Sequence, residues 1–313
     1  MALSAPRVTR KHKLLVKIEA DKGTYIAVDT AIKVFDLDIA PTAEFIERKG
    51  SGVYLGQNST GVLGSLSASC SFQTELRGNG SSGLEAGLAI LLQACGYAKT
   101  SEVYNASSDY ASQATISIAV WQDGKKKTMA GCSGNVTFEG ETGDRLMCSF
   151  EFSGKWAAPI DDTISAVAES TATPMMLKGG TFTLGGESIK VASVNLNMNC
   201  QVTARPDIDD ASGIGNYIVA DWDPTLQLVA EADLVGTFLP GYNYYGIWLA
   251  GTEAAVSLLL TDGTVNVTFA IPAAQIKEIK NSDGDGIEME DLTYQCNNSS
   301  GDDAVTITAA AAA

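Results

Sequence analysis

The sequence predicts a mainly β protein of two tandem β-sandwich domains, with a flanking α-helix in the first. Three observations predict this fold. Apolar and polar residues alternate with a period of two along most of the 313-residue chain, which is typical of strands with one buried face. One segment alone follows a helical period, and the order of the elements repeats at an offset of about 150–160 residues.

The alternating segments predict strands separated by Asp-Gly and Gly-Gly turns. In the run 65–72, for example, Leu66, Ala68 and Cys70 alternate with serines. The other long runs cover 146–152, 192–202 and 265–271, and shorter ones cover 14–18, 25–39, 114–121, 226–234 and 287–296. Strands of this kind need a partner surface, so we expect packed β-sheets.

The predicted helix covers residues 84–95. Its apolar residues recur at i, i+4, i+7, i+8 and i+11, which is an amphipathic stripe: Leu84, Leu88, Leu91, Leu92 and Cys95. Ser82 and Glu85 have the spacing of a capping box, and Gly96 suits the position after the helix.

The domain boundary is placed in the small and polar stretch from Pro159 to Pro174. We therefore expect a first domain at 1–160 and a second at 161–313. The first contains a long irregular connection at 40–64, of a length that is usually functional in a compact domain. The second ends in an acidic C-terminal tail, because seven acidic residues and no basic one follow Lys280.

Charge and residue usage argue against an enzyme and against a protein that grips nucleic acid. The chain has 37 acidic and 21 basic side chains, and a surface with a formal charge of −16 repels phosphates. The only histidine, His12, lies in a basic segment, so no Ser-His-Asp or Cys-His site is expected. Six cysteines without a C-x-x-C pair predict buried free thiols, as in a reducing cytosol, rather than disulfides. No cofactor or metal site is expected.

The segment Asn281–Gly286 is similar to the first half of a calcium-binding loop. Its oxygen ligands and glycine fit, but Leu292 stands at the twelfth position, where a bidentate Glu is needed. A tight β-turn is the favoured interpretation.

Two kinds of exposed side chain remain as candidate surfaces. Small neutral residues line the polar faces of two predicted strands, where they form either an ordinary solvent-facing sheet or a surface with little for a phosphate to bind. An aromatic cluster is either a ligand platform or, as we favour, a core or subunit contact; it comprises Phe238, Tyr242, Tyr244, Tyr245 and Trp248.

Three stretches give the chain a resemblance to a known family. They are GLEAGLAILLQACGY (83–97), SIAVWQDGKKKTMAGCSGNVTFEGETGDRLMCSFEFSGKW (117–156) and VNVTFAIPAAQIKEIKNSDGDGIEMEDLTYQC (265–296). The first resembles the helix, and the others the later strands, of the tail tube (major tail) proteins of long, non-contractile-tailed bacteriophages of the siphophage type. The resemblance extends over most of the chain, which is longer than the single-domain members.

The resemblance implies two tail-tube-type, barrel-forming domains and a structural role. Sheets of neighbouring subunits would close around a lumen, and stacked rings would form an acidic conduit for genome DNA that does not bind it specifically. Three chains would supply six domains per ring, or six chains would be needed if the second half is an appendage. The resemblance further implies that the 40–64 loop reaches the next ring, with Glu44, Glu47, Arg48 and Lys49 as candidate contacts.

Lumen or assembly candidates are Ser67, Ser69, Ser71, Asn195, Asn197, Asn199, Glu288 and Glu290. The implied partners are other copies of the chain and the terminator, tape measure and tip proteins of the tail. The implied location is the virion tail, after assembly in the bacterial host cytoplasm. No membrane partner is expected, since no apolar run reaches the roughly 18–20 residues of a membrane span. The alternative is a receptor- or carbohydrate-binding β-sandwich, such as an adhesin or tail-tip module, with its site in the aromatic segment 238–248.

Overall fold

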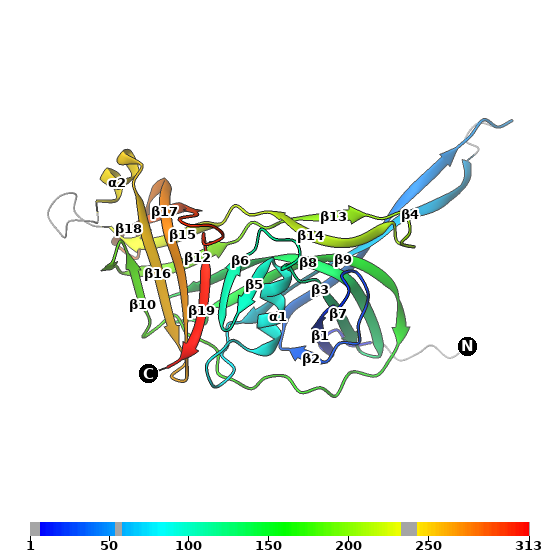
Figure 1. The fold of residues 1–313 in the computed structure, drawn as a ribbon, viewed down its shortest axis with the longest axis horizontal. Helices are drawn as coiled ribbons and strands as arrows, with labels where there is room; N and C mark the ends of the chain where they lie inside the picture. The colour runs from blue at the N-terminus through cyan, green and yellow to red at the C-terminus, as the bar shows by residue number, and fades with distance from the viewer. Residues whose placement is uncertain (1–6, 54–57, 233–242, 313) are drawn as a thin grey trace.

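A computed structural model of the protein describes residues 7–53, 58–232 and 243–312. The prediction of a mainly β protein is confirmed, with long antiparallel sheets and two short helices in this part of the chain. The molecule is elongated. A β-hairpin arm formed by β3 and β4 projects from one end of its long axis, and α2 lies at the other end (Figure 1).

The first half of the chain pairs its six main strands in the order β1-β7-β8-β9-β4-β3, always antiparallel. Their bounds are β1 (His12–Ile18), β7 (Ile116–Gln122), β8 (Lys125–Glu141), β9 (Met147–Asp161), β4 (Asn58–Glu75) and β3 (Phe35–Lys49). The short strand β2 (Thr30–Ile32) pairs with β1, while β5 (Tyr97–Thr100) and β6 (Val103–Ala106) form a hairpin after helix α1 (Ala86–Ala94).

The second half pairs its main strands in the corresponding order, β10-β16-β17-β18-β15-β12. Their bounds are β10 (Thr181–Leu184), β16 (Glu253–Thr261), β17 (Val265–Gly284), β18 (Ile287–Asn297), β15 (Thr225–Glu231) and β12 (Val191–Asn197). Helix α2 (Tyr244–Ala250) follows β15 along the chain as α1 follows β4. The remaining strands are β11 (Glu187–Ser188), β13 (Gln201–Pro206), β14 (Ile214–Asp221) and β19 (Thr306–Ala311).

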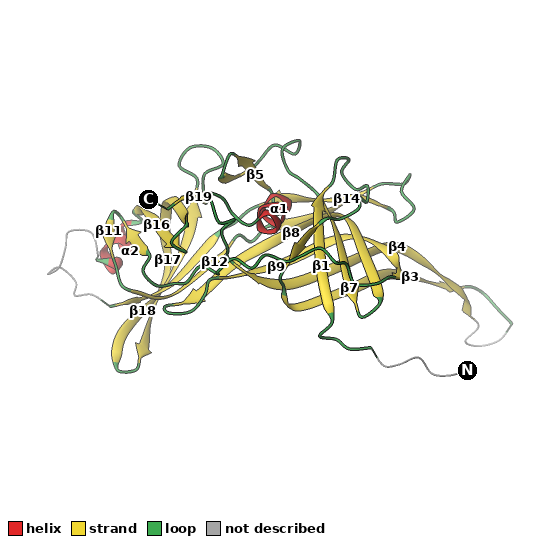
Figure 2. Ribbon diagram, turned by 90° about the horizontal axis from the view of Figure 1, so that it is seen from below, coloured by secondary structure: helices red, strands yellow, loops and turns green. Residues whose placement is uncertain are grey.

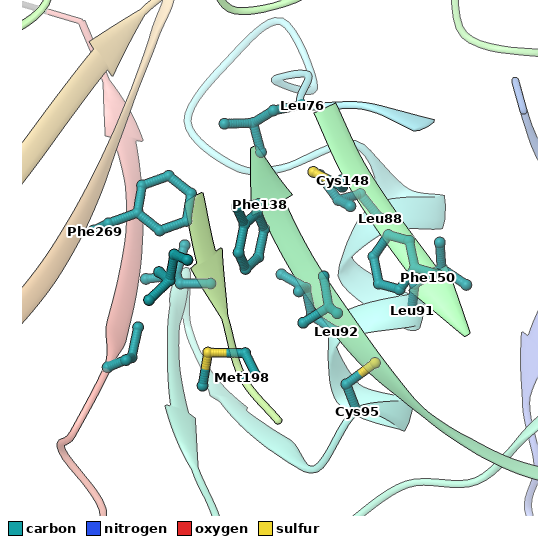
Figure 3. Packing of buried hydrophobic residues seen from close by; sticks show 14 of the residues in the cluster. Leu76, Leu88, Leu91, Leu92, Cys95, Phe138, Cys148, Phe150, Met198 and Phe269 are labelled. Carbon is teal, nitrogen blue, oxygen red and sulfur yellow. The ribbon is translucent and has the colours of Figure 1, made fainter. Parts of the chain in front are cut away.

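The two halves are joined by strand pairing and by a shared core. β12 pairs with the second part of β8, and β19 pairs with both β17 and β6. One cluster of buried apolar residues extends through both halves, and within it the rings of Phe138 and Phe269 meet edge to face at 5.0 Å (Figure 3). The division at residue 160 stays a prediction.

A β-bulge at the same place in each half redirects a long strand. In β8, the residues from Met129 to Cys132 lie opposite Ile118 to Ile116 of β7, so β8 has one residue more than its partner. In β17, Ile271 to Ala274 lie opposite Val256 to Ala254 of β16 in the same way. Bulges bend a strand and increase its twist. On one edge, β8 therefore pairs with β7 before its bulge and with β12 after it.

Helix α1 confirms the predicted apolar stripe, since Leu88, Leu91 and Leu92 are all buried in the core. The predicted capping box is wrong. Asn79 Oδ1 instead accepts hydrogen bonds from the amides of Ser81, Ser82 and Gly83, and Glu85 occupies the N-cap position without a capping side-chain bond. Gly96 follows the helix with a φ of 85°, as its position predicts.

Three further expectations differ from the structure. Segment 40–64 is not an irregular loop, because its described residues belong mainly to the paired strands β3 and β4. The C-terminal segment is not a free acidic tail, since it ends in strand β19 and Asp302 accepts a hydrogen bond from the Ser108 amide. The alternating run 192–202 is interrupted after Asn197, where β12 ends. The six cysteines are free, as predicted, and only Cys200 is not fully buried.

Candidate functional site

Eight strands form one uninterrupted antiparallel sheet through the molecule, in the order β3-β4-β9-β8-β12-β15-β18-β17. Figure 2 shows β18, β12, β9, β4 and β3 following one another along the long axis. On one face of this sheet, alternate residues such as Phe72, Phe150 and Leu292 are buried in the core. The residues between them form the opposite face, which we call the polar face.

The polar face brings together most of the neutral residues singled out in the sequence. Ser67, Ser69 and Ser71 lie on it in β4, and Asn195 and Asn197 lie on it in β12. Asn135 of β8 donates from Nδ2 to Oδ1 of Asn197 at 3.1 Å, which links the two halves on this face. The two groups of residues, far apart in sequence, therefore belong to a single surface.

Asn199 lies outside this sheet. It follows the end of β12 with a φ of 47°, and its side-chain amide donates to the Asp223 carbonyl at 2.8 Å and to Thr225 Oγ1 at 3.1 Å. Asn tolerates this left-handed backbone better than most residues do. Its contacts hold a local turn, so the structure does not place it among the residues of the polar face.

Glu288 and Glu290, the two remaining lumen or assembly candidates, do not lie on the polar face. They alternate in phase with Leu292, Tyr294 and Cys296, whose side chains are buried. Glu290 is itself buried, whereas Glu288 is exposed near the β17–β18 turn. The sequence alone did not give their face, because the apolar phase changes between Met289 and Leu292.

Acidic side chains missed by the sequence analysis lie on the polar face, since strand register places them there. They include Asp38, Glu139, Glu151, Glu278 and Asp291. Lys280 is on the same face and its Nζ lies 2.9 Å from Glu278 Oε2. Glu139 is held in place by hydrogen bonds from Ser149 Oγ at 3.0 Å and Gln73 Nε2 at 3.4 Å. Their alternation with Ile39, Phe138 and Phe150 was the signal available in the sequence.

The β13–β14 hairpin contacts one end of the polar face. Lys155, which pairs with Ser67 across β9 and β4, reaches Asp210 of the hairpin at 2.7 Å. The Lys155 ammonium, followed by the Ser212 hydroxyl and amide, lowers the pKa of Asp210 to about 2. Ser67 therefore lies beside the hairpin, while Ser69 and Ser71 lie farther from this contact.

The β3–β4 arm carries the four predicted contact residues, Glu44, Glu47, Arg48 and Lys49, all exposed. Glu47 and Lys49 form an ion pair at 2.6 Å. The arm also exposes apolar residues on both of its faces, because Phe45 is opposite Leu63 and Ile46 is opposite Val62 in the ladder. An apolar patch on a projecting hairpin is typical of a surface that a partner covers.

The 281–286 segment forms a turn, and the described residues of the aromatic cluster lie in or near helix α2. Asp285 and Gly286 both have positive φ in a two-residue β-turn, closed by the Gly286 amide donating to Asp283 Oδ1 at 2.8 Å. Tyr244 is buried in the core at the start of α2, and Trp248 is partly exposed. Phe238 and Tyr242 lie outside the described residues.

In the part of the chain that the structure describes, no cluster of His, Cys, Asp or Glu side chains could hold a metal ion. Neither described helix is long and apolar enough to cross a membrane.

A family model for phage tail tube proteins matches residues 9–296, which is almost the whole chain. The chain belongs to the phage tail tube protein family. No curated protein matches it. This tail tube protein is thus a structural component of the virion tail that assembles with copies of itself. Membership of a structural family also agrees with the prediction that the protein is not an enzyme.

Proposed function

We propose that this tail tube protein polymerises into stacked rings that enclose a conduit for genome DNA in a long, non-contractile phage tail. The observation that carries the proposal is the eight-stranded sheet with a polar face opposite its core. A sheet of this kind leaves exposed edges in a single chain, and closure into a barrel removes them. The polar face then lines the lumen.

The two halves of the chain act as two copies of one tube domain, divided near residue 160. The shared strand order and the matching bulges of β8 and β17 support this division. Three chains then supply six domains to each ring. Rings assemble in the host cytoplasm, where the buried free thiols remain reduced.

The charge of the lumen explains how DNA passes without being held. Among the described residues, the polar face carries the acidic residues named above together with Glu141 and Glu231, and its exposed lysine, Lys280, pairs with Glu278. Lys155 is also paired, with Asp210. Phosphates therefore meet repulsion and neutral amide or hydroxyl groups rather than free cations. DNA slides because no site on the wall binds it tightly.

The β3–β4 arm joins one ring to the next. Its exposed apolar residues on both faces and its charged side chains would be buried between rings, which removes the apolar patch from water. The terminator, tape measure and tip proteins complete the tail at its ends and in its lumen.

Electron microscopy of the purified protein tests tube formation. We expect uniform hollow tubes with a regular ring repeat at high protein concentration. Dispersed particles under all conditions would contradict the proposal and would favour a receptor- or carbohydrate-binding module.

Charge reversal tests the lumen. A virion carrying Glu151→Lys and Asp291→Lys should assemble normal tails but eject DNA more slowly, because four units of positive charge per chain are added to the polar face. The matched control carries Asp161→Lys and Glu187→Lys, exposed positions at strand ends outside the polar face. Equal ejection kinetics in the two variants would refute the role of lumen charge.

A further inference from the structure

β8 and β12 form a junction between the two halves of the chain. The strands that correspond to them in the opposite half, β17 and β3, lie at the two ends of the eight-stranded sheet. β12 pairs with the part of β8 that follows its bulge, with Asn197 opposite Thr137 and Asn195 opposite Glu139. β7 occupies the same edge of β8 before the bulge. Beyond the bulge, this edge of β8 no longer pairs with β7, and β12 of the other half pairs with it instead.

The matching bulges fix which residues of the two halves correspond. Met129 to Cys132 of β8 correspond to Ile271 to Ala274 of β17, opposite β7 and β16 respectively. β17 has one further bulge, between Ile276 and Glu278 opposite β18. Thr137 therefore corresponds to Lys280, and Glu139 corresponds to Ser282.

The residues of β3 that correspond to β12 are found by following the next strand ladders. Glu139 and Ser282 lie opposite Met147 and Met289, which lie in turn opposite Glu75 and Glu231. Counting back along β4 and β15 to their partners in β3 and β12 makes Asp38 the counterpart of Asn195 and Ala40 the counterpart of Asn197. The buried residues keep the same phase throughout: Cys148 corresponds to Glu290 and Phe150 to Leu292, all of them buried.

Both counterpart edges are open within the chain. Among the described residues, β3 pairs only with β4, and β17 beyond Ile276 pairs only with β18. A side chain beside the open edge of β17 is less buried than its counterpart beside the internal junction. Val136 beside the internal junction is fully buried, whereas its counterpart Ile279 is partly exposed.

We propose that β17 of one chain pairs with β3 of a second copy in the register of the internal β8–β12 junction. Lys280 then lies opposite Ala40, and Ser282 lies opposite Asp38. In Figure 1, β17 lies toward one end of the long axis and the β3–β4 arm projects from the other end. Contacts between unlike edges are heterologous and generate a ring when the rotation closes. Three chains contain three internal and three such external junctions. This inference rests on the proposed tube and specifies the contact that closes it.

The side chains at the proposed junction are complementary. On the polar face, the carboxylate of Asp38 becomes a diagonal neighbour of the Lys280 ammonium, a spacing at which opposite charges stabilise antiparallel pairs. Both residues are exposed in the single chain. The external junction is one hydrogen bond shorter than the internal one. Met198 donates its amide to the Val136 carbonyl at 3.1 Å, and its counterpart, Pro41, has no amide hydrogen.

Cysteine cross-linking in assembled tubes tests the register. The Met198–Val136 hydrogen bond places Thr137 and Asn197 in a non-hydrogen-bonded pair, with Cα atoms about 4.5 Å apart. That spacing permits a disulfide. The variant A40C/K280C should therefore form disulfides between chains on mild oxidation, and D38C/S282C provides the same test at the next pair. The control A40C/N281C places the second thiol on the opposite face of β17.

The wild-type protein is first shown to form tubes; their absence would overturn the proposed function itself. We then expect non-reducing gels of either paired variant to show species of one, two and three chains and none larger, with at least tenfold less cross-linking in the control. Tubes in which neither pair cross-links would overturn the proposed junction. A ladder that continues beyond three chains would overturn the three-chain ring.

Discussion

Replacing Glu19 by Gln should destabilise the first half, because this buried carboxylate holds the β8 bulge in place. Oε1 accepts hydrogen bonds from the Gly131 amide at 2.7 Å and the Ser117 hydroxyl at 2.9 Å. Oε2 accepts from the Gly23 amide and the Thr115 hydroxyl, both at 2.7 Å. Gly131 lies within the bulge and has a φ of 61°. One side chain therefore ties the bulge to β7 and to the turn after β1.

The expected loss of unfolding free energy follows from the hydrogen-bond donors that face the Glu19 carboxylate. In Glu19→Gln, the new NH₂ group must face one backbone amide and one hydroxyl. The hydroxyl can rotate and accept, but the amide is left without an acceptor, at a cost of about 1–3 kcal/mol. The two bonds kept by the remaining oxygen lose their charge assistance, roughly 1 kcal/mol each, and this loss is partly offset because a buried charge is removed. We expect a net loss of about 2–4 kcal/mol.

Urea denaturation of the dispersed protein, followed by tryptophan fluorescence, measures this loss. The control is Glu47→Gln on the arm, whose side chain is 62% exposed and forms an ion pair with Lys49. Its cost should be below about 0.5 kcal/mol. If the two variants unfold at the same urea concentration with equal slopes, the four hydrogen bonds of Glu19 do not stabilise the bulge and the reasoning fails.

Two further predictions concern the hairpin contact and the arm. The pKa of Asp210 is about 2, below the ordinary value of 3.8, so its contact with Lys155 stabilises the fold above pH 4 and is lost as the pH falls from about 4 to about 2. Asp210→Asn should therefore flatten this part of the curve of unfolding free energy against pH. An unchanged curve would contradict the stabilising role of the Asp210–Lys155 contact. Phe45→Ser with Leu63→Ser should leave the unfolding free energy within about 0.5 kcal/mol, since both side chains are exposed, while tubes seen by electron microscopy become shorter; tubes of normal length would exclude an inter-ring role for these residues.

Sequence periodicity predicted the strands that pack on the core and failed where strands leave it. Ser67, Ser69 and Ser71 alternate with buried residues, so their common face could be predicted. The arm was missed because Phe45 and Ile46 are adjacent apolar residues on opposite faces of β3, which gives no period of two. Neither face of the arm packs on the core of its own chain, so nothing selects an apolar phase there.

The face of Glu288 and Glu290 could not be predicted for the same reason. Ile287 and Met289 are apolar, yet they lie on the polar face near the turn, beyond the closely packed part of the core. Pairing of β17 with β18 continues there without a bulge, so the backbone keeps its phase although the side-chain pattern shifts. Strand register, which the sequence alone does not give, decides the face.

The two halves place a bulge at corresponding positions with different residues. Gly131 supplies a positive φ in the bulge of β8, whereas β17 has Pro272 and Ala273 at the corresponding place. Proline is tolerated at a bulge because one ladder hydrogen bond is already missing there. A bulge at this place therefore leaves the residue types free to differ between the halves.

That freedom explains the chemical difference between the two kinds of junction in the proposed ring. The internal junction aligns neutral Asn197 with Thr137 and never has to find its partner, because the two strands share a chain. The external junction brings Asp38 near Lys280, and it must form between separate molecules. Opposite charges favour the correct encounter, since Asp38 and Lys280 attract one another. A pair of opposite charges is thus found at the three junctions where the ring has to choose its partner.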